Sequence, residues 1–134
     1  MLAVTSPSKV VNVKSPPSVF VVVNNELEKY CQKNLPDMIL GAGSISDETM
    51  ANMYISSGSN FIVGPLTNKN VAVACNRKKI PYMPGCLTPS EISKAEELGC
   101  DVVKVFPADS VDGPSFIKSV LAPMPWSWIM PTGG

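Results

Sequence analysis

The chain has 134 residues, of which 45% are hydrophobic and 16% charged, and its 11 basic residues balance its 11 acidic ones. This length and composition predict one folded domain, and the balanced charge argues against a nucleic-acid partner or an acidic membrane partner. Histidine is absent, which excludes Ser-His-Asp and Cys-His catalysis, and the four scattered cysteines make a poor set of metal ligands.

Cysteine usage and hydropathy indicate the cellular setting. Four thiols without a Cys-x-x-Cys pair are typical of buried small side chains in a reducing compartment. The apolar runs are shorter than the ~18 to 20 residues that span a bilayer. We therefore expect a cytoplasmic protein with no membrane-spanning segment and no metal.

The sequence predicts an irregular leader over residues 1–17 and one domain over residues 18–134. Pro7, Pro16 and Pro17 interrupt any regular element in the leader. The domain alternates short apolar runs with segments of helical periodicity, and the runs end roughly every 20 to 25 residues, as in βα units of a parallel sheet. The predicted strands cover residues 19–23, 38–40, 60–63, 80–83, 102–106 and 127–130.

Helices are predicted between these strands. The first spans residues 25–34, and the second opens at Ser46 and turns Met50, Met53 and Tyr54 toward the core. Alternating strands and helices of this kind predict an α/β fold, either a barrel or a doubly wound sheet.

The two later helices carry clearer signals. The third covers residues 67–79 and ends in basic residues that complement the helix dipole. The fourth has Thr88 as its N-cap, Glu91 as the capping-box partner and Gly99 as its stop.

Lys104 stands in the apolar strand of residues 102–106, which ends in a Pro-Ala loop signal. An ammonium group is costly to bury, so burial lowers the pKa of a lysine and enriches the free amine that attacks carbonyls to form a Schiff base. The alternative interpretation is a lysine at a strand end whose ammonium reaches solvent.

Turn residues follow five of the predicted strands. In either α/β architecture, function collects in the loops at the carboxyl ends of the strands. Glycine there lets backbone N–H groups approach an anion, and Ser44 and Thr132 add hydroxyls. The alternative is that glycine and proline only mark turns. The loops begin at residues 41, 64, 84, 107 and 131.

Five segments stand in a characteristic order and spacing. They are Gly-Ala-Gly-Ser at 41–44, Ile-Pro-Tyr-Met-Pro-Gly at 80–85, Leu-Thr-Pro-Ser-Glu-Ile at 87–92, Val-Lys-Val-Phe-Pro-Ala at 103–108 and Pro-Thr-Gly-Gly at 131–134. As a set they resemble the 2-keto-3-deoxy-6-phosphogluconate (KDPG) and 4-hydroxy-2-oxoglutarate (KHG) aldolases. The resemblance runs from about Glu26 to the last residue.

The resemblance implies a (β/α)8 barrel and a class I aldolase that cleaves KDPG or KHG to pyruvate and an aldehyde. Lys104 would form an imine with the C2 carbonyl of pyruvate, and Phe106 would pack against that imine. No metal or organic cofactor is implied. The implied partners are a small oxo-acid and further copies of the chain in a homotrimer.

The resemblance also implies roles for residues around the imine. Gly43, Ser44 and Pro65 would line the pyruvate pocket. The substrate carboxylate or phosphate would be held by Thr132, Gly133 and Gly134.

The chain departs from the family pattern at its second strand and at its ends. The acid-base glutamate, the threonine and the substrate-binding arginine of the family fall on Val21, Val23 and Asn25. Loss of the carboxylate lowers the rate of proton transfer by a factor of roughly 10² to 10⁴, with Glu26 and Glu28 as alternative carboxylates on the helix side. We expect about six strands of eight, hence a partial barrel truncated at both ends with exposed sheet edges.

Two other hypotheses stay open. The chain is a non-catalytic aldolase-like remnant, which binds an oxo-acid or a partner subunit, if the loss of the carboxylate at Val21 stops turnover. A different phosphate-binding barrel enzyme is the third reading, and the Phe-Pro-Ala context of Lys104 argues against it.

Overall fold

The computed structural model describes residues 2–3, 19–22 and 25–133. Their strands are β1 (Leu2–Ala3), β2 (Val19–Val22), β3 (Ile39–Ala42), β4 (Phe61–Val63), β5 (Tyr82–Met83), β6 (Gly85–Cys86), β7 (Val102–Val105) and β8 (Trp128–Pro131). Their helices are α1 (Asn25–Asn34), α2 (Glu48–Ser57), α3 (Lys69–Lys78), α4 (Pro89–Glu97), the 3-10 helix η1 (Ala108–Val111) and α5 (Gly113–Leu121). Each of the six predicted strands overlaps an observed one.

The strands pair in parallel and in chain order. One sheet has the order β1-β2-β3-β4-β5 and the other has the order β6-β7-β8. Pro84 separates β5 from β6 because proline has no N–H to give to a ladder. Its carbonyl still accepts the N–H of Lys104 at 2.9 Å, so the two sheets continue one another across this residue.

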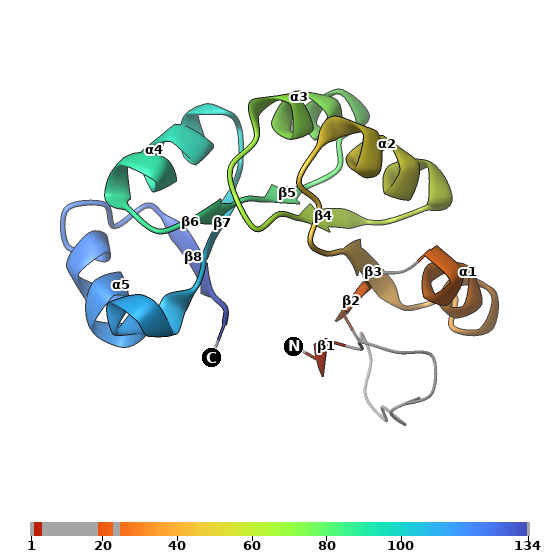
Figure 1. The fold of residues 1–134 in the computed structure, drawn as a ribbon, viewed down its shortest axis with the longest axis horizontal. Coiled ribbons are helices and arrows are strands. Elements are labelled where there is room, and N and C mark those ends of the chain that lie inside the picture. Colours follow the sequence, from red (N-terminus) through yellow and green to blue (C-terminus); the bar gives the residue numbers. More distant parts are fainter. Residues whose placement is uncertain (1, 4–18, 23–24, 134) are drawn as a thin grey trace.

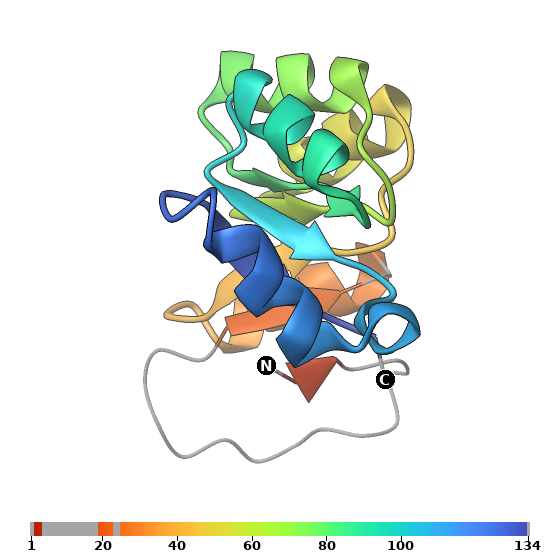
Figure 2. The same cartoon turned by 90° about the vertical axis from the view of Figure 1, so that its left-hand side faces the viewer.

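The strands form an arc with the helices on its convex side (Figure 1). The outermost strands, β1 and β8, lie at the open side of this arc, and a view turned by 90° shows the helices stacked over the strands (Figure 2). Parallel strands joined by helices on one side are the arrangement of a (β/α)8 barrel. The predicted fold class, a partial barrel of this type, is confirmed.

The core lies between the sheet and the outer helices. In β7, Val103 and Val105 are fully buried in the same apolar cluster as Ile92 of α4, whereas Val102 and Lys104 are half-buried. Successive side chains of a strand point to opposite faces, so Lys104 lies on the concave face of the arc. This alternation positions the candidate site.

The start of α2 differs from the prediction. The N-cap is Asp47 rather than Ser46, because its carboxylate accepts the N–H of Met50 at 2.9 Å. Ala51 and Tyr54 define the buried face of this helix, and Met53 is 46% exposed. The prediction that Met53 points toward the core was therefore wrong.

Two further predictions on the elements need correction. Leu2 and Ala3 pair with β2, so the predicted irregular leader contains a short strand; its prolines come later in the chain and do not interrupt this pairing, and residues 4–17 lie outside the described part. The helix α5, which begins at Gly113-Pro114, was not predicted. Proline is favoured in the first turn of a helix, where its missing N–H is not needed.

None of the helices in the described ranges has the length and apolar character needed to cross a membrane.

Candidate functional site

Lys104 lies on the concave face of β7, between two neighbouring strands. Its register partners are Gly85 of β6 and Met130 of β8. Burial lowers the pKa of its ammonium below the ordinary lysine value, and no nearby charge contributes to the shift. The strand therefore presents an amine with an increased neutral fraction, which is the form that attacks a carbonyl.

Phe106 covers the end of the Lys104 side chain. The Nζ of Lys104 lies over the ring, 4.3 Å from its centroid. The Phe106–Pro107 peptide bond is cis. The lysine and the ring are in contact in this structure.

The loop after β8 packs against the same ring. The N–H of Thr132 donates to Val105, and the carbonyl of Thr132 accepts from Ala108, both at 3.0 Å. Gly133 has φ +88°, and a Cβ on it would lie 3.1 Å from Cδ2 of Phe106, so glycine is needed for this close approach. Gly134 lies outside the described residues.

The side-chain hydroxyl of Thr132 is a buried polar group without a hydrogen-bond partner among the described residues. Buried hydroxyls are normally paired, and an exception calls for an explanation such as a ligand. Thr132 therefore supplies a donor or acceptor near Phe106.

A cavity of about 340 Å³ opens beside Phe106. Pro65 and Leu66 come to it from the loop after β4, and Leu87 comes from the loop after β6. The structure thus brings Pro65 to the same cavity as Phe106. We call this space the Phe106 cavity; its other lining residues are Thr67, Gly85, Cys86, Glu91 and Lys94.

Gly43 and Ser44 lie further along the same edge of the arc. They follow β3, whose loop is tied to β4 by the N–H of Ile45, which donates to Val63 at 3.1 Å. Ser44 is exposed and has φ +60°. Because β4 and the β5–β6 segment separate β3 from β7, these two residues are not part of the group around Lys104.

The glycines at the strand ends serve packing. The N–H of Gly64 donates to Met83 at 3.0 Å, so this group is not available to an anion as predicted. A Cβ on Gly85 would overlap the carbonyl of Pro65. At these two positions the simpler reading of the sequence, glycine as a turn and packing residue, is the correct one.

Sequence reasoning missed the side chains that hold the cavity loops. Thr67 Oγ1 donates to the carbonyl of Gly85 at 3.2 Å, and the hydroxyl of Tyr82 donates to Leu66 at 2.9 Å. Glu91 accepts from the loop after β6. Only Glu91 had a signal in the sequence, the capping box, which was interpreted as the start of a helix and nothing more.

The second strand lacks a carboxylate in the expected place. No aspartate or glutamate precedes Glu26, and Val21 pairs in register with Gly41 of β3. Val23 and the side chains of Val21 and Asn25 lie outside what the structure describes. An approaching carboxylate would raise the pKa of Lys104, and burial is the sole cause of its observed change.

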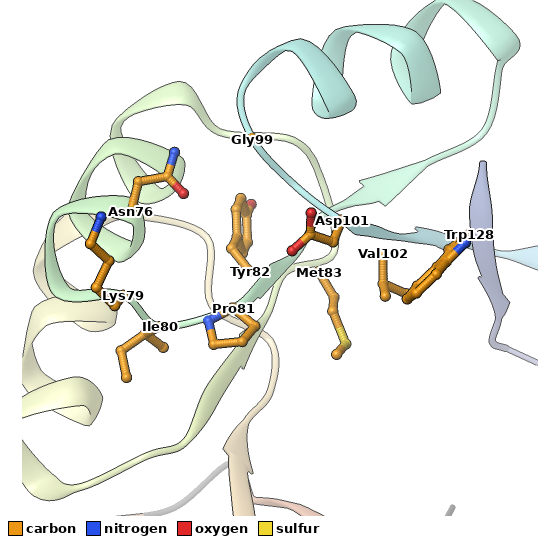
Figure 3. A pocket seen from close by; sticks show the side chains of 10 residues that line it. All are labelled: Asn76, Lys79, Ile80, Pro81, Tyr82, Met83, Gly99, Asp101, Val102 and Trp128. Atoms are coloured by element: carbon orange, nitrogen blue, oxygen red, sulfur yellow. The ribbon is translucent and has the colours of Figure 1, made fainter. Parts of the chain in front are cut away.

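A larger cavity, of about 580 Å³, lies at the opposite, amino-terminal ends of the strands. Figure 3 shows Met83, Val102 and Trp128 pointing away from the helices there, and Lys79 and Asp101 also line the cavity. None of the predicted site residues lines this cavity. Since active sites of parallel α/β folds form at the carboxyl ends, the group around Lys104 is the candidate site. Within the described residues, His, Cys, Asp and Glu form no group of three that could hold a metal ion.

Comparison with known proteins gives the family. The family model "KDPG and KHG aldolase" matches residues 20–134. A 2-dehydro-3-deoxy-phosphogluconate aldolase of Haemophilus influenzae is 37% identical over 101 residues, which are 75% of this chain and 48% of that protein. The enzyme of the same name from Treponema pallidum is 34% identical over 98 residues, 73% of this chain and 47% of that protein.

Solved structures agree with these sequence relatives. The KDPG aldolase of Legionella pneumophila, solved with pyruvate captured as a covalent carbinolamine intermediate, has a TM-score of 0.81 at 25% identity, covering 87% of this chain and 59% of that one. The enzyme of Zymomonas mobilis with 3-phosphoglycerate has a TM-score of 0.80 at 25% identity, covering 87% and 58%. The chain spans about half the length of the curated relatives it matches. On its sequence, its parallel βα arrangement and this match over residues 20–134, the chain belongs to the KDPG and KHG aldolase family.

Proposed function

We propose that the chain acts on 2-oxo acids of the KDPG and KHG class through a Schiff base on Lys104. The amine of Lys104 adds to the C2 carbonyl to give a carbinolamine, which loses water to form an iminium ion. Water then takes the proton of the C4 hydroxyl as the electrons of the C3–C4 bond move to the iminium nitrogen, which releases an aldehyde and leaves the enamine of pyruvate. Protonation of the enamine at C3 and hydrolysis return pyruvate and the free lysine.

The observation that carries this proposal is the state of Lys104. The side chain is half-buried, its ammonium has a lowered pKa, and its Nζ lies over Phe106. The ring attracts a cation, so it stabilises the iminium ion as well as the ammonium. The covalent carbinolamine of the Legionella pneumophila enzyme is chemistry of the same kind in a protein of the same fold.

The loop after β8 supports a place for the substrate carboxylate. The buried Oγ1 of Thr132 lacks a partner within the described residues, and Gly133 lies against Phe106. We assign the carboxylate or the start of the phosphate site to Thr132, Gly133 and Gly134. Gly43, Ser44 and Pro65 line the more distant side of the pocket in this proposal.

A second candidate function is binding of an oxo-acid without turnover. One observation favours it: burial is the cause of the lowered pKa of Lys104, and no charge of a described carboxylate contributes to it. Proton transfer at C3 would then be slow. Exchange of the methyl hydrogens of pyruvate with deuterium oxide separates the candidates, because only an enzyme that forms the enamine promotes it.

Borohydride trapping tests the imine directly. The folded chain is incubated with pyruvate and borohydride, and the reduced adduct is located by intact-mass analysis and peptide mapping. We expect one adduct on Lys104, its loss in Lys104→Met and its retention in Lys94→Met. Lys94 is the matched control because it lines the Phe106 cavity but is paired with Glu97 at 2.6 Å. An adduct that persists in Lys104→Met would contradict the assignment.

The resemblance also carries a proposed oligomeric state. We expect a homotrimer, and sedimentation equilibrium of the purified chain measures it directly. A monomer at micromolar concentration would contradict this part of the proposal.

A further inference from the structure

The backbone of the site is hydrogen-bonded to Pro84 and to β6. The N–H of Lys104 donates to the carbonyl of Pro84 at 2.9 Å, and the N–H of Phe106 donates to that of Cys86 at 3.1 Å. Leu87 follows directly and lines the same cavity as Phe106. The position of Leu87 therefore shapes the wall that faces Phe106.

Glu91 holds this loop through one carboxylate oxygen. Its Oε2 accepts the N–H of Leu87 at 2.8 Å, the N–H of Thr88 at 2.9 Å and the hydroxyl of Thr88 at 3.0 Å. In a capping box the glutamate carboxylate needs to accept only the N–H of the N-cap residue, here Thr88. The bond to Leu87 is additional, and it ties the helix start to the cavity wall.

The charge state of Glu91 suits this task. Hydrogen bonding lowers the pKa of its carboxyl group, and the N–H of Leu87 is the largest cause. The group therefore stays ionised at neutral pH, where it accepts charge-assisted hydrogen bonds.

The opposite wall of the cavity is held independently. Thr67 bonds to the carbonyl of Gly85, and Tyr82 bonds to the carbonyl of Leu66 from inside the core. Glu91 by contrast is exposed and packs in no part of the core. Removing it should release the Leu87 wall while the Leu66 wall stays in place.

We propose that Glu91 is a positioning residue of the substrate pocket, which through Leu87 sets the cavity wall facing the part of the oxo-acid beyond its pyruvate unit. This role rests on the proposed imine chemistry of Lys104. It concerns the six-carbon substrate and not pyruvate, because the cavity is lined by Phe106 and Leu87 and not by Lys104, which would hold the pyruvate unit.

The test compares two oxo-acids on one set of variants. Total borohydride-trapped adduct is measured against the concentration of KDPG and, separately, of pyruvate. In Glu91→Ala we expect the half-saturating concentration of KDPG to rise by about tenfold and that of pyruvate to stay within about twofold. Glu91→Gln keeps an acceptor oxygen and should restore most of the affinity for KDPG.

Thr88→Ala is the matched control for helix stability. It removes the bond from the N–H of Glu91 to Thr88 Oγ1 at 3.2 Å, which caps α4, and the bond from the Thr88 hydroxyl to Glu91 Oε2 at 3.0 Å. Both backbone N–H groups still donate to the carboxylate. We expect its half-saturating concentrations to match those of the unaltered chain. Should Glu91→Ala fail to fold by circular dichroism, Leu87→Ala decides instead, and it should weaken KDPG and spare pyruvate.

Three outcomes overturn the proposal in distinguishable ways. Equal loss for both oxo-acids in Glu91→Ala, or the same loss in Thr88→Ala, would assign Glu91 to helix stability alone. If the half-saturating concentration of KDPG is unchanged in Leu87→Ala, Leu87 does not contribute to substrate binding. If the unaltered chain forms no adduct with either oxo-acid, the proposed function itself fails and the role of Glu91 falls with it.

Discussion

The Nζ of Lys104 lies 4.3 Å from the centre of the Phe106 ring, and two effects act on it in opposite directions there. The face of the ring attracts the ammonium, which favours the charged form. Burial favours the neutral form and lowers the pKa of Lys104. The pair thus combines a reactive amine with a surface that stabilises the cationic iminium ion it would form.

This pKa makes stability depend on pH in a defined direction. An unfolded lysine titrates near about pH 10.4, and folding moves the pKa of Lys104 below that value. Between the two values the unfolded chain binds more protons than the folded chain, so the free energy of unfolding rises with pH in this range. Burial of Lys104 therefore costs no stability above the unfolded pKa, and it destabilises the fold as pH falls through the folded pKa. We expect Lys104→Met to be more stable than the unaltered chain at pH 7, and this advantage to shrink toward pH 10.5.

Urea unfolding at several pH values measures the difference. Lys118→Met is the control for the loss of one positive charge, because Lys118 is exposed on α5. A constant gap between Lys104→Met and the unaltered chain across this range would contradict the argument.

Gly85→Ala should destabilise the chain by about 1 to 3 kcal/mol, as overpacking does. Its Cβ would overlap the carbonyl of Pro65, which is backbone and cannot rotate away. Gly113→Ala is the matched control, since the nearest atom would be the Ala108 carbonyl oxygen at 3.4 Å, an ordinary contact. Chemical denaturation of both variants measures the effect, and equal stability of the two would contradict the packing role of Gly85.

Local signals in the sequence predicted most of the fold. The alternation of apolar runs and helices, with the capping box of Thr88 and Glu91, predicted the βα order that the structure confirms. The exposure of Met53 could not be predicted, because the burial of a helix face depends on its neighbours and not on its own residues. The helix α5 begins with Gly113-Pro114. Glycine and proline are common both in turns and in the first turn of a helix, so these two residues do not distinguish a turn from a helix start.

The candidate site was predictable in part for a similar reason. The resemblance pointed to Lys104 and Phe106 together, and residues two apart on a strand share a face, which agrees with their contact in the structure. The hydrogen bonds of Tyr82 to Leu66 and of Thr67 to Gly85 join residues 16 and 18 positions apart. Such contacts depend on how the loops pack, which no local pattern specifies.

The four cysteines should resist alkylation in the folded chain. All are buried, and burial raises the pKa of Cys75 to about 11 and that of Cys100 to about 12. Only the thiolate reacts, so at pH 8 these two should label at least about 100-fold more slowly than an unperturbed thiol. Iodoacetamide labelling followed by peptide mapping, with a guanidinium-unfolded sample as reference, measures the rates. Labelling of Cys100 before the less deeply buried Cys31 would contradict this order.

Tyr82→Phe should lower the free energy of unfolding by about 1 to 3 kcal/mol. The buried hydroxyl donates to the carbonyl of Leu66 at 2.9 Å and accepts from the N–H of Asn68 at 3.3 Å, and phenylalanine leaves both groups without this partner. Because Leu66 lines the Phe106 cavity, the half-saturating concentration of KDPG in the trapping assay should rise as well. Tyr30→Phe removes a hydroxyl from a side chain that is 51% exposed and should change neither quantity. If Tyr82→Phe is less stable but binds KDPG as well as the unaltered chain, the Tyr82 hydroxyl stabilises the fold only, and the Leu66 wall does not touch the substrate.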